Sequence, residues 1–184
     1  MIVRSISLDF FRNYLHLEAG FHPGVNVIYG ENAQGKTNLL EAVAYLSTAS
    51  SHRARYDREL IQFGVDHAFV QAQVSARQRD FTLEARLSRG GRRQLFSNGV
   101  RLKSAGELAG VLTTVLFCPE DLYLIREGAL VRRRFLDGCI SQLRPRYAEA
   151  LAEYRRLYEH KTRILRDGTE KPSLLDALDE FNLR

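Results

Sequence analysis

Eight consecutive residues of this chain have the types and the spacing of a phosphate-binding loop. Residues 30 to 37 read GENAQGKT and fit the pattern G-x-x-x-x-G-K-[ST]. The two glycines permit backbone angles that a Cβ atom forbids, so successive main-chain N–H groups can converge on one anion. Lys36 would supply a charge for the β- and γ-phosphates, and Thr37 a hydroxyl for Mg²⁺. The candidate nucleotide-binding residues are Gly30, Glu31, Asn32, Ala33, Gln34, Gly35, Lys36 and Thr37.

The segments on either side of this loop are those that its chemistry requires. Residues 25 to 29 (VNVIY) are β-branched and aromatic, which predicts a buried strand. Residues 38 to 46 place apolar side chains at helical spacing, so a helix should begin near Lys36 and turn the positive end of its dipole toward the loop. An ordinary glycine turn before a helix would need neither the lysine nor the threonine.

Composition is that of a globular protein of 184 residues, with 45% hydrophobic and 27% charged residues. The chain has no run of eighteen apolar residues and no signal-peptide layout, and Cys118 and Cys139 lack metal-ligand spacing. We therefore expect buried thiols, a cytoplasmic location and no membrane partner. The net charge of +5 favours a polyanionic partner only weakly.

The remaining pattern predicts an α/β fold in two parts. Residues 1–118 form a phosphate-loop ATPase lobe that lacks its C-terminal half, and residues 119–184 a truncated helical lobe. The expected strands are 2–10, 15–19, 25–29, 68–74, 81–87, 94–96 and 111–117, with a hairpin turn at Asn98-Gly99. The expected helices are 38–46, 57–63, 120–126, 130–142, 145–166 and 174–184. Because the last helical pattern stops without a cap, we expect the sequence to be part of a longer protein.

A complete phosphate-loop ATPase also needs an acid at the end of a second apolar strand. The one candidate is the segment 115–121 (VLFCPED), but Pro119 interrupts it, and a helix N-terminus is the better interpretation. No signature for contacting a nucleotide across a dimer is present either. The chain thus holds half of a catalytic site, and we assign no catalytic residue within it.

Several stretches together resemble the N-terminal half of the RecF family of bacterial DNA replication and repair proteins. They are FRNY at 11–14, VNVIYGENAQGKTNLLEA at 25–42, SHR at 51–53, FCPEDL at 117–122 and VRRRFLD at 131–137. The sequence departs from the family at Ala129, where proline is usual, and at Cys118, where a small residue is usual.

The resemblance implies an ABC/SMC-type ATPase lobe with mixed and antiparallel β-sheet, followed by a helical lobe. It implies ATP and Mg²⁺ as cofactors, ATP-driven homodimerisation, and weak DNA-dependent ATPase activity of the full-length protein. It also implies double-stranded DNA and single-strand/double-strand junctions as partners, and recombinase loading with RecO and RecR.

For each of the other candidate functional residues, a structural role is an open alternative to the functional one. Arg12, in the turn between the first two strands, is either a neighbour of the phosphates or a surface arginine. His52 is either functional or a hydrogen-bonded loop residue, and Glu120 and Asp121 either sense nucleotide or cap a helix. The arginines 132–134 either link the lobes or contact DNA. The basic residues between Arg77 and Lys103 either track phosphates or coat a solvated sheet face, and tyrosines 147, 154 and 158 are expected to pack between helices.

Two further functions stay open beside a RecF-like, DNA-binding ATPase. One is a regulatory module that senses ATP without hydrolysing it, which the incomplete catalytic set favours. The other is a different SMC-like ATPase with a nuclease domain downstream, of which this sequence shows no sign.

Overall fold

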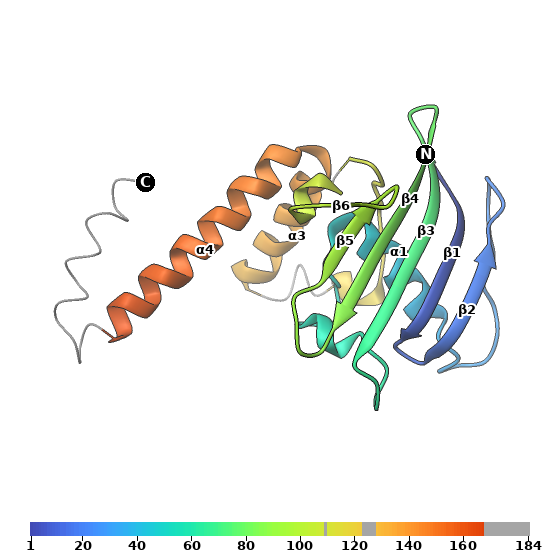
Figure 1. The fold of residues 1–184 in the computed structure, drawn as a ribbon, viewed down its shortest axis with the longest axis horizontal. Coiled ribbons are helices and arrows are strands. Elements are labelled where there is room, and N and C mark those ends of the chain that lie inside the picture. Colours follow the sequence, from blue (N-terminus) through green and yellow to red (C-terminus); the bar gives the residue numbers. More distant parts are fainter. Residues whose placement is uncertain (109, 123–127, 168–184) are drawn as a thin grey trace.

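The computed structural model describes residues 1–108, 110–122 and 128–167, and within these a sheet lies beside a helical arm (Figure 1). The sheet has six antiparallel strands in the order β2-β1-β3-β4-β5-β6. The strands are β1 (Ile2–Phe11), β2 (Tyr14–Gly20), β3 (His67–Ala76), β4 (Arg79–Ser88), β5 (Gln94–Ser97) and β6 (Val100–Arg101). The α-helices are α1 (Lys36–Thr48), α3 (Ala129–Leu143) and α4 (Pro145–Asp167). Three short 3-10 helices are η1 (Asp57–Glu59), η2 (Ala105–Glu107) and η3 (Pro119–Leu122).

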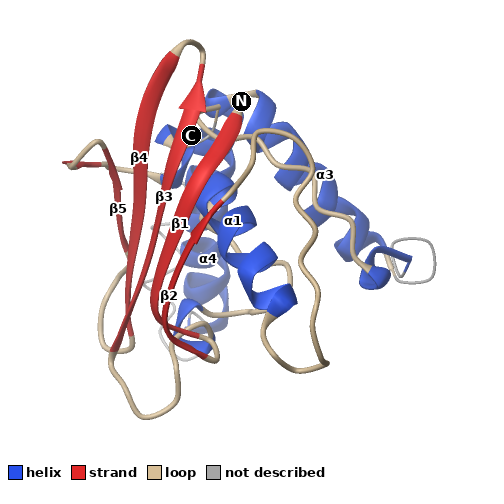
Figure 2. Cartoon of the chain, turned by 90° about the vertical axis from the view of Figure 1, so that its right-hand side faces the viewer, coloured by secondary structure: helices blue, strands red, loops and turns tan. Residues whose placement is uncertain are grey.

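The core lies between one face of the sheet and helix α1. Alternate residues of β3 are buried, because successive side chains of a strand point to opposite faces. Three of them have buried cross-strand partners on β4: Ala68 with Leu87, Val70 with Ala85 and Ala72 with Leu83. Helix α1 covers this face with Ala42, Tyr45 and Leu46, each fully buried. Figure 2 shows α1 on one side of the sheet and no helix on the other.

The predicted strands 2–10, 15–19, 68–74, 81–87 and 94–96 are confirmed, as is the Asn98-Gly99 hairpin between β5 and β6. Helices expected at 38–46, 130–142 and 145–166 are confirmed with bounds shifted by a few residues. The helix expected over 57–63 is shorter than predicted, a single 3-10 turn, η1. The segment 120–126 begins within η3 and then leaves the described residues, and 174–184 lies outside them altogether.

The strands predicted at 25–29 and 111–117 are wrong, since both segments are irregular. Val25, Val27 and Tyr29 are 88%, 77% and 89% exposed, and Val115 and Phe117 are 98% and 80% exposed. A strand forms only against a neighbour that accepts its main-chain hydrogen bonds. No described strand pairs with either segment, so the described sheet is wholly antiparallel rather than mixed.

The helical arm is only loosely joined to the sheet lobe. Neither α3 nor α4 has a buried residue among those described. The N-terminal end of α4 rests on η2, where a Cβ atom at Gly106 would lie 3.2 Å from Glu149 Cγ and 3.4 Å from the Pro145 carbonyl oxygen. The two arm helices are linked by Tyr147, whose hydroxyl donates to Asp137 Oδ1 at 2.6 Å.

Candidate phosphate-binding site

The loop from Gly30 to Gly35 has the backbone that an anion cradle requires. Gly30, Ala33 and Gly35 have positive φ angles of 143°, 65° and 102°. Helix α1 begins directly afterwards at Lys36, with no side-chain cap and no acid in its first turn. The first N–H groups of the helix therefore have no capping acceptor and stay available to an anion.

Lys36 closes the mouth of this loop. Its Nζ donates to the carbonyl oxygens of Gly30 at 2.8 Å and Glu31 at 2.6 Å. Thr37, one residue further, is exposed at the same helix end. Lys36 and Thr37 are thus adjacent at the N-terminal end of α1, and their assignment to phosphate and Mg²⁺ remains a prediction.

The turn between β1 and β2 packs against the phosphate loop. A Cβ atom at Gly35 would lie 2.7 Å from Asn13 Oδ1 and 2.9 Å from Tyr14 Cζ. Asn38 Nδ2, in the first turn of α1, donates to Asn13 Oδ1 at 2.8 Å. The turn that carries Arg12 thus adjoins the loop, and the assignment of Arg12 itself to the phosphates remains a prediction.

Arg12 is held by a buried carboxylate that the sequence analysis missed. Its Nε donates to Glu41 Oε2 at 2.9 Å and its Nη2 to Glu41 Oε1 at 2.7 Å. The Glu41 side chain is 0% exposed. It also accepts a 2.5 Å hydrogen bond from Ser51 Oγ, and Arg53 Nη1 lies 3.6 Å away. The sequence did contain a signal for this pair: Glu41 lies among the apolar residues of the helix predicted over 38–46. A buried carboxylate needs a cationic partner, so an arginine nearby could have been expected.

Burial on its own would raise the pKa of Glu41, because a charged carboxylate loses its water. The hydrogen bonds from Arg12 and Ser51, together with the charges of Arg12 and Arg53, outweigh that effect and hold the pKa below its ordinary value. Glu41 is therefore ionised at neutral pH, and it fixes the guanidinium of Arg12 next to the loop.

The other candidates fall into three groups. His52 is exposed, and its Nε2 lies 3.6 Å from Cys118 Sγ. Asp121 Oδ2 accepts from the Cys118 main-chain N–H at 2.7 Å and so caps η3, whereas the side chain of Glu120 lies outside those described. The arginines 132–134 are all exposed on α3.

The basic residues of the β-meander do not act as one group. Arg89 donates to the main-chain oxygens of Ile61, Gln62 and Val65. Arg93 pairs with Asp57 at 3.0 Å, and Arg86 pairs with Glu84 and stacks on Phe96. These three arginines make contacts within the sheet lobe, so their guanidinium groups are already engaged.

The expected packing of tyrosines between the arm helices is wrong for two of the three. Tyr147 contacts α3, but Tyr154 and Tyr158 are 63% and 60% exposed and stack on each other, with ring centroids 6.1 Å apart. Their spacing of four residues places them on one face of α4, and no described helix covers that face.

A nucleoside triphosphate with Mg²⁺ fits the residues of the loop. A side chain at Gly35 would meet Asn13 and Tyr14 of the β1–β2 turn. Mg²⁺ keeps several waters and takes few protein ligands, so the hydroxyl of Thr37 and the phosphates would suffice. No group of three or more His, Cys, Asp or Glu side chains that could hold a metal by itself occurs among the described residues.

A family model described as the RecF/RecN/SMC N terminal domain matches residues 2–123. The chain belongs to this family. The RecF likeness expected from its motifs is also confirmed: the chain is 40% identical over 185 residues to the DNA replication and repair protein RecF of Agathobacter rectalis. That match covers 100% of this chain and 51% of the relative, so the chain spans about half the length of the curated relatives it matches.

Solved RecF structures have the same fold. One, described as the recombination mediator protein RecF-ATPrS in the RecFOR pathway, superposes with a TM-score of 0.86 at 37% identity and covers 97% of this chain and 48% of its own. A second, described as RecF-ATP, gives 0.83 at 38% identity over 90% of this chain and 45% of its own. The RecF/SMC-type ATPase lobe, an antiparallel sheet with helices, is thereby confirmed as the fold. Among the helices described here, none is long and apolar enough to cross a bilayer.

Proposed function

We propose that this chain is the ATP-binding part of a RecF-like protein of DNA replication and repair. One observation supports the proposal most directly. The loop 30–35 has positive φ angles at both glycines and leads directly into α1, and Lys36 Nζ donates to the Gly30 carbonyl oxygen within the loop. The similarity to RecF structures described with ATP and ATPrS supports ATP as the nucleotide.

Each loop residue has a definite task in this proposal. The main-chain N–H groups of the loop and of the first turn of α1 bind the phosphate oxygens, and Lys36 exchanges its two carbonyl partners for the β- and γ-phosphates. Bound Mg²⁺ neutralises phosphate charge and is held by Thr37. Arg12 adds a positive charge beside the loop, oriented by Glu41.

The wider activity belongs to the whole protein and rests on its likeness to RecF. It comprises ATP-driven homodimerisation on double-stranded DNA near single-strand gaps, weak DNA-dependent ATP hydrolysis, and recombinase loading with RecO and RecR in the cytoplasm. Because the chain spans about half of its relatives, the remaining part of the catalytic site would come from the rest of such a protein.

Replacing Lys36 by alanine tests the proposal. Lys36→Ala removes the charge for the phosphates, so we expect ATP binding by the chain and ATP-dependent dimerisation of the full-length protein to be lost with the fold intact. Nucleotide binding is measured with a fluorescent ATP analogue, dimerisation by sedimentation, and folding by circular dichroism. Lys103→Ala, an exposed lysine remote from the loop in sequence, is the matched control. Undiminished ATP-induced dimers in Lys36→Ala would refute the assignment.

A module that binds ATP without hydrolysing it is the second candidate, and one observation favours it. The segment 115–121, the only sequence candidate for the acid of a second strand, is no strand, and Asp121 caps η3 instead. Single-turnover hydrolysis by the full-length protein distinguishes the two functions: phosphate release supports the ATPase, and binding without release supports the sensor.

A further inference from the structure

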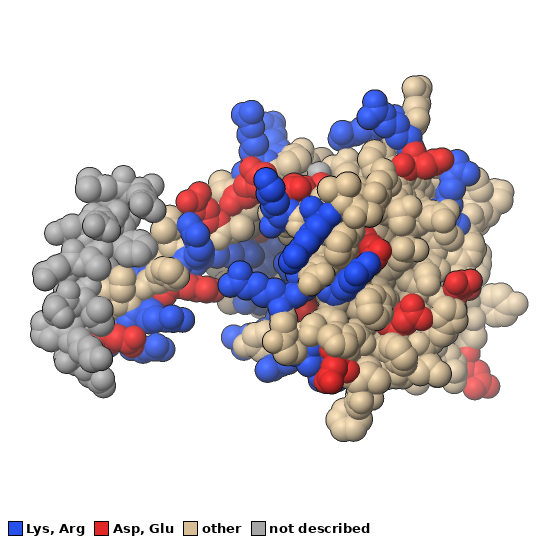
Figure 3. Space-filling model, viewed as in Figure 1, with Lys and Arg blue, Asp and Glu red and all other residues tan. Residues whose placement is uncertain are grey.

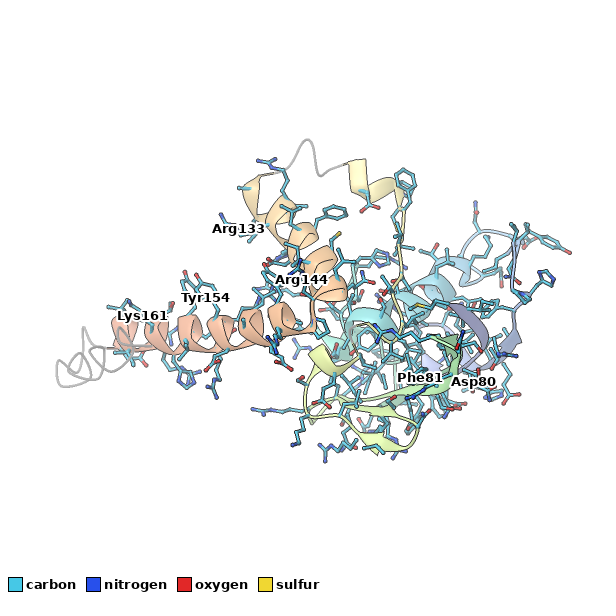
Figure 4. All side chains as sticks on the ribbon, turned by 90° about the horizontal axis from the view of Figure 1, so that it is seen from above. Asp80, Phe81, Arg133, Arg144, Tyr154 and Lys161 are labelled. Atoms are coloured by element: carbon cyan, nitrogen blue, oxygen red, sulfur yellow. The ribbon has the colours of Figure 1, made fainter. Side chains whose placement is uncertain are left out.

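A notch opens at the end of the sheet where β3 turns into β4. It has a volume of about 360 Å³ and is lined by Met1, Arg4, Ser75, Ala76, Arg77, Gln78, Arg79 and Asp80. Sites for small ligands measure about 300–1,000 Å³, so the notch has room for a phosphate with its neighbouring sugars. Figure 4 looks onto this end of the molecule, with Asp80 over the sheet and Arg144 at the corner between the arm helices.

Two of the three arginines in this notch keep their charge uncompensated. Asp80 is paired internally, because it accepts from Ser75 and lies 3.8 Å from Arg4 Nε. Within the described part of the chain, no hydrogen bond or ion pair engages the side chain of Arg77 or Arg79. These two differ from Arg86, Arg89 and Arg93, whose guanidinium groups are occupied within the lobe.

The side chains of Arg77, in the turn, and Arg79, at the start of β4, are both exposed. Arg77 and Gln78 both have positive φ angles, 51° and 61°, as the central residues of a two-residue hairpin do. Arg77 Nη2 lies 3.5 Å from the position that a Cβ atom of Gly110, in the segment after η2, would take. Figure 3 shows basic side chains projecting from the top edge of the molecule at this turn.

The open face of the sheet is a poor surface for a polyanion. By strand register, Asp9, Glu18, Asp80 and Glu84 point to the side away from α1. A DNA backbone laid across the middle of that face would meet Asp9, Glu18 and the paired Glu84 and Arg86, whereas Asp80 lies at the hairpin end beside Arg4. The charge that suits a phosphate is concentrated at the hairpin end instead.

We propose that the notch at the β3–β4 turn binds a backbone phosphate of double-stranded DNA through Arg77 and Arg79. Guanidinium groups bind phosphate oxygens through paired N–H donors, and contacts of this kind position a protein on a duplex without reading its sequence. The proposal rests on the proposed function, since it assigns a contact for the DNA partner of that function. It does not involve the nucleotide site.

The test is the salt dependence of duplex binding by the double variant Arg77→Gln and Arg79→Gln. A fluorescein-labelled 20-base-pair duplex is titrated with the chain at several salt concentrations, and the dissociation constant is read by anisotropy. Each phosphate contact contributes about 0.9 to the slope of log K against log salt, so loss of the one phosphate contact at the notch should lower the slope by about one. Arg92→Gln with Arg163→Gln, which removes two other exposed charges, should change it less.

Other outcomes separate this proposal from the proposed function. Equal slopes in the two double variants would overturn the notch, as would an unmodified chain that binds inorganic phosphate but no duplex at low salt. Binding of a fluorescent ATP analogue should be unchanged in Arg77→Gln with Arg79→Gln. If Lys36→Ala fails to weaken that ATP binding while the notch variant loses DNA, the nucleotide assignment falls and the DNA contact stands.

Discussion

Gly35 lies where the phosphate loop, helix α1 and the β1–β2 turn meet. Its φ of 102° disfavours a side chain, and a Cβ atom, 2.7 Å from Asn13 Oδ1 and 2.9 Å from Tyr14 Cζ, would have to displace these two side chains. The motif predicted a glycine here for its backbone angle. The motif could not predict the contact of Gly35 with Asn13 and Tyr14, because these residues belong to a turn that lies about twenty-two residues earlier in the chain.

Gly35→Ala should therefore destabilise the fold by about 1–3 kcal/mol, as overpacking does, and abolish nucleotide binding. The free energy of unfolding is measured by urea titration, and binding with a fluorescent ATP analogue. Gly64→Ala is the control, because Gly64 also has a positive φ, 87°, but no atom lies within 4 Å of its Cβ position. Equal losses in the two variants would show that backbone strain alone is responsible.

Glu41 makes stability near the site depend on pH. Its pKa is lower in the folded chain than in the unfolded one, so the folded state binds fewer protons and the contribution of Glu41 is complete above the unfolded pKa, about 4.3. It is lost as the pH falls through the lower folded value.

Glu41→Gln should lower the free energy of unfolding at pH 7 by about 1–3 kcal/mol, because the partners of a buried charge lose their ionic acceptor. The difference from the unmodified chain should shrink as the pH is lowered below about 4. Urea titrations at pH 7, 5 and 3.5 measure it, with the exposed Glu153→Gln as control. A pH-independent difference would contradict the assigned pKa direction.

At the scale of elements, the antiparallel strands and the helices α1, α3 and α4 were predictable, because each carries its own period of apolar residues. The segments 25–29 and 111–117 were predicted wrongly for a physical reason. Their β-branched and aromatic residues have the composition of strands, but composition does not supply a partner, and Tyr29 and Val115 lie almost fully in solvent. The buried pairing of Arg12 with Glu41 was equally invisible, since its two residues are 29 positions apart.

We expect the amides of residues 25–29 and 115–117 to exchange with deuterium rapidly in this chain, and far more slowly in a longer protein that supplies neighbouring strands. Main-chain N–H groups without an acceptor exchange without any unfolding step. Hydrogen–deuterium exchange with mass spectrometry measures this, with the paired strand β3 as the protected reference. Strong protection in the isolated chain would contradict the described structure.

At the scale of the whole molecule, the proposed function gives the chain the phosphate-loop side of a nucleotide site. Hydrolysis in such ATPases also needs groups that orient water and stabilise the transferred phosphoryl, and no such acid was assigned within this sequence. The family could be identified because five separate stretches occur together, whereas the phosphate loop alone would have indicated only a nucleotide.

We expect the isolated chain to bind ATP weakly and to hydrolyse it negligibly compared with the full-length protein. The opposing surface that would hold the γ-phosphate is expected from the rest of the protein. Colorimetric phosphate release, with and without duplex DNA, measures the difference. Turnover by the chain equal to that of the full-length protein would show that the site is complete within these residues.

The seat of α4 on Gly106 has a mechanical consequence. A straight helix of 23 residues measures roughly 34 Å, and this one approaches η2 through Pro145 and Glu149, in its first turns. A pivot of ten degrees at that seat sweeps the far end of the helix through roughly 6 Å over this length. Small movements beside η2 are thereby magnified along α4 into much larger displacements at its C-terminal end.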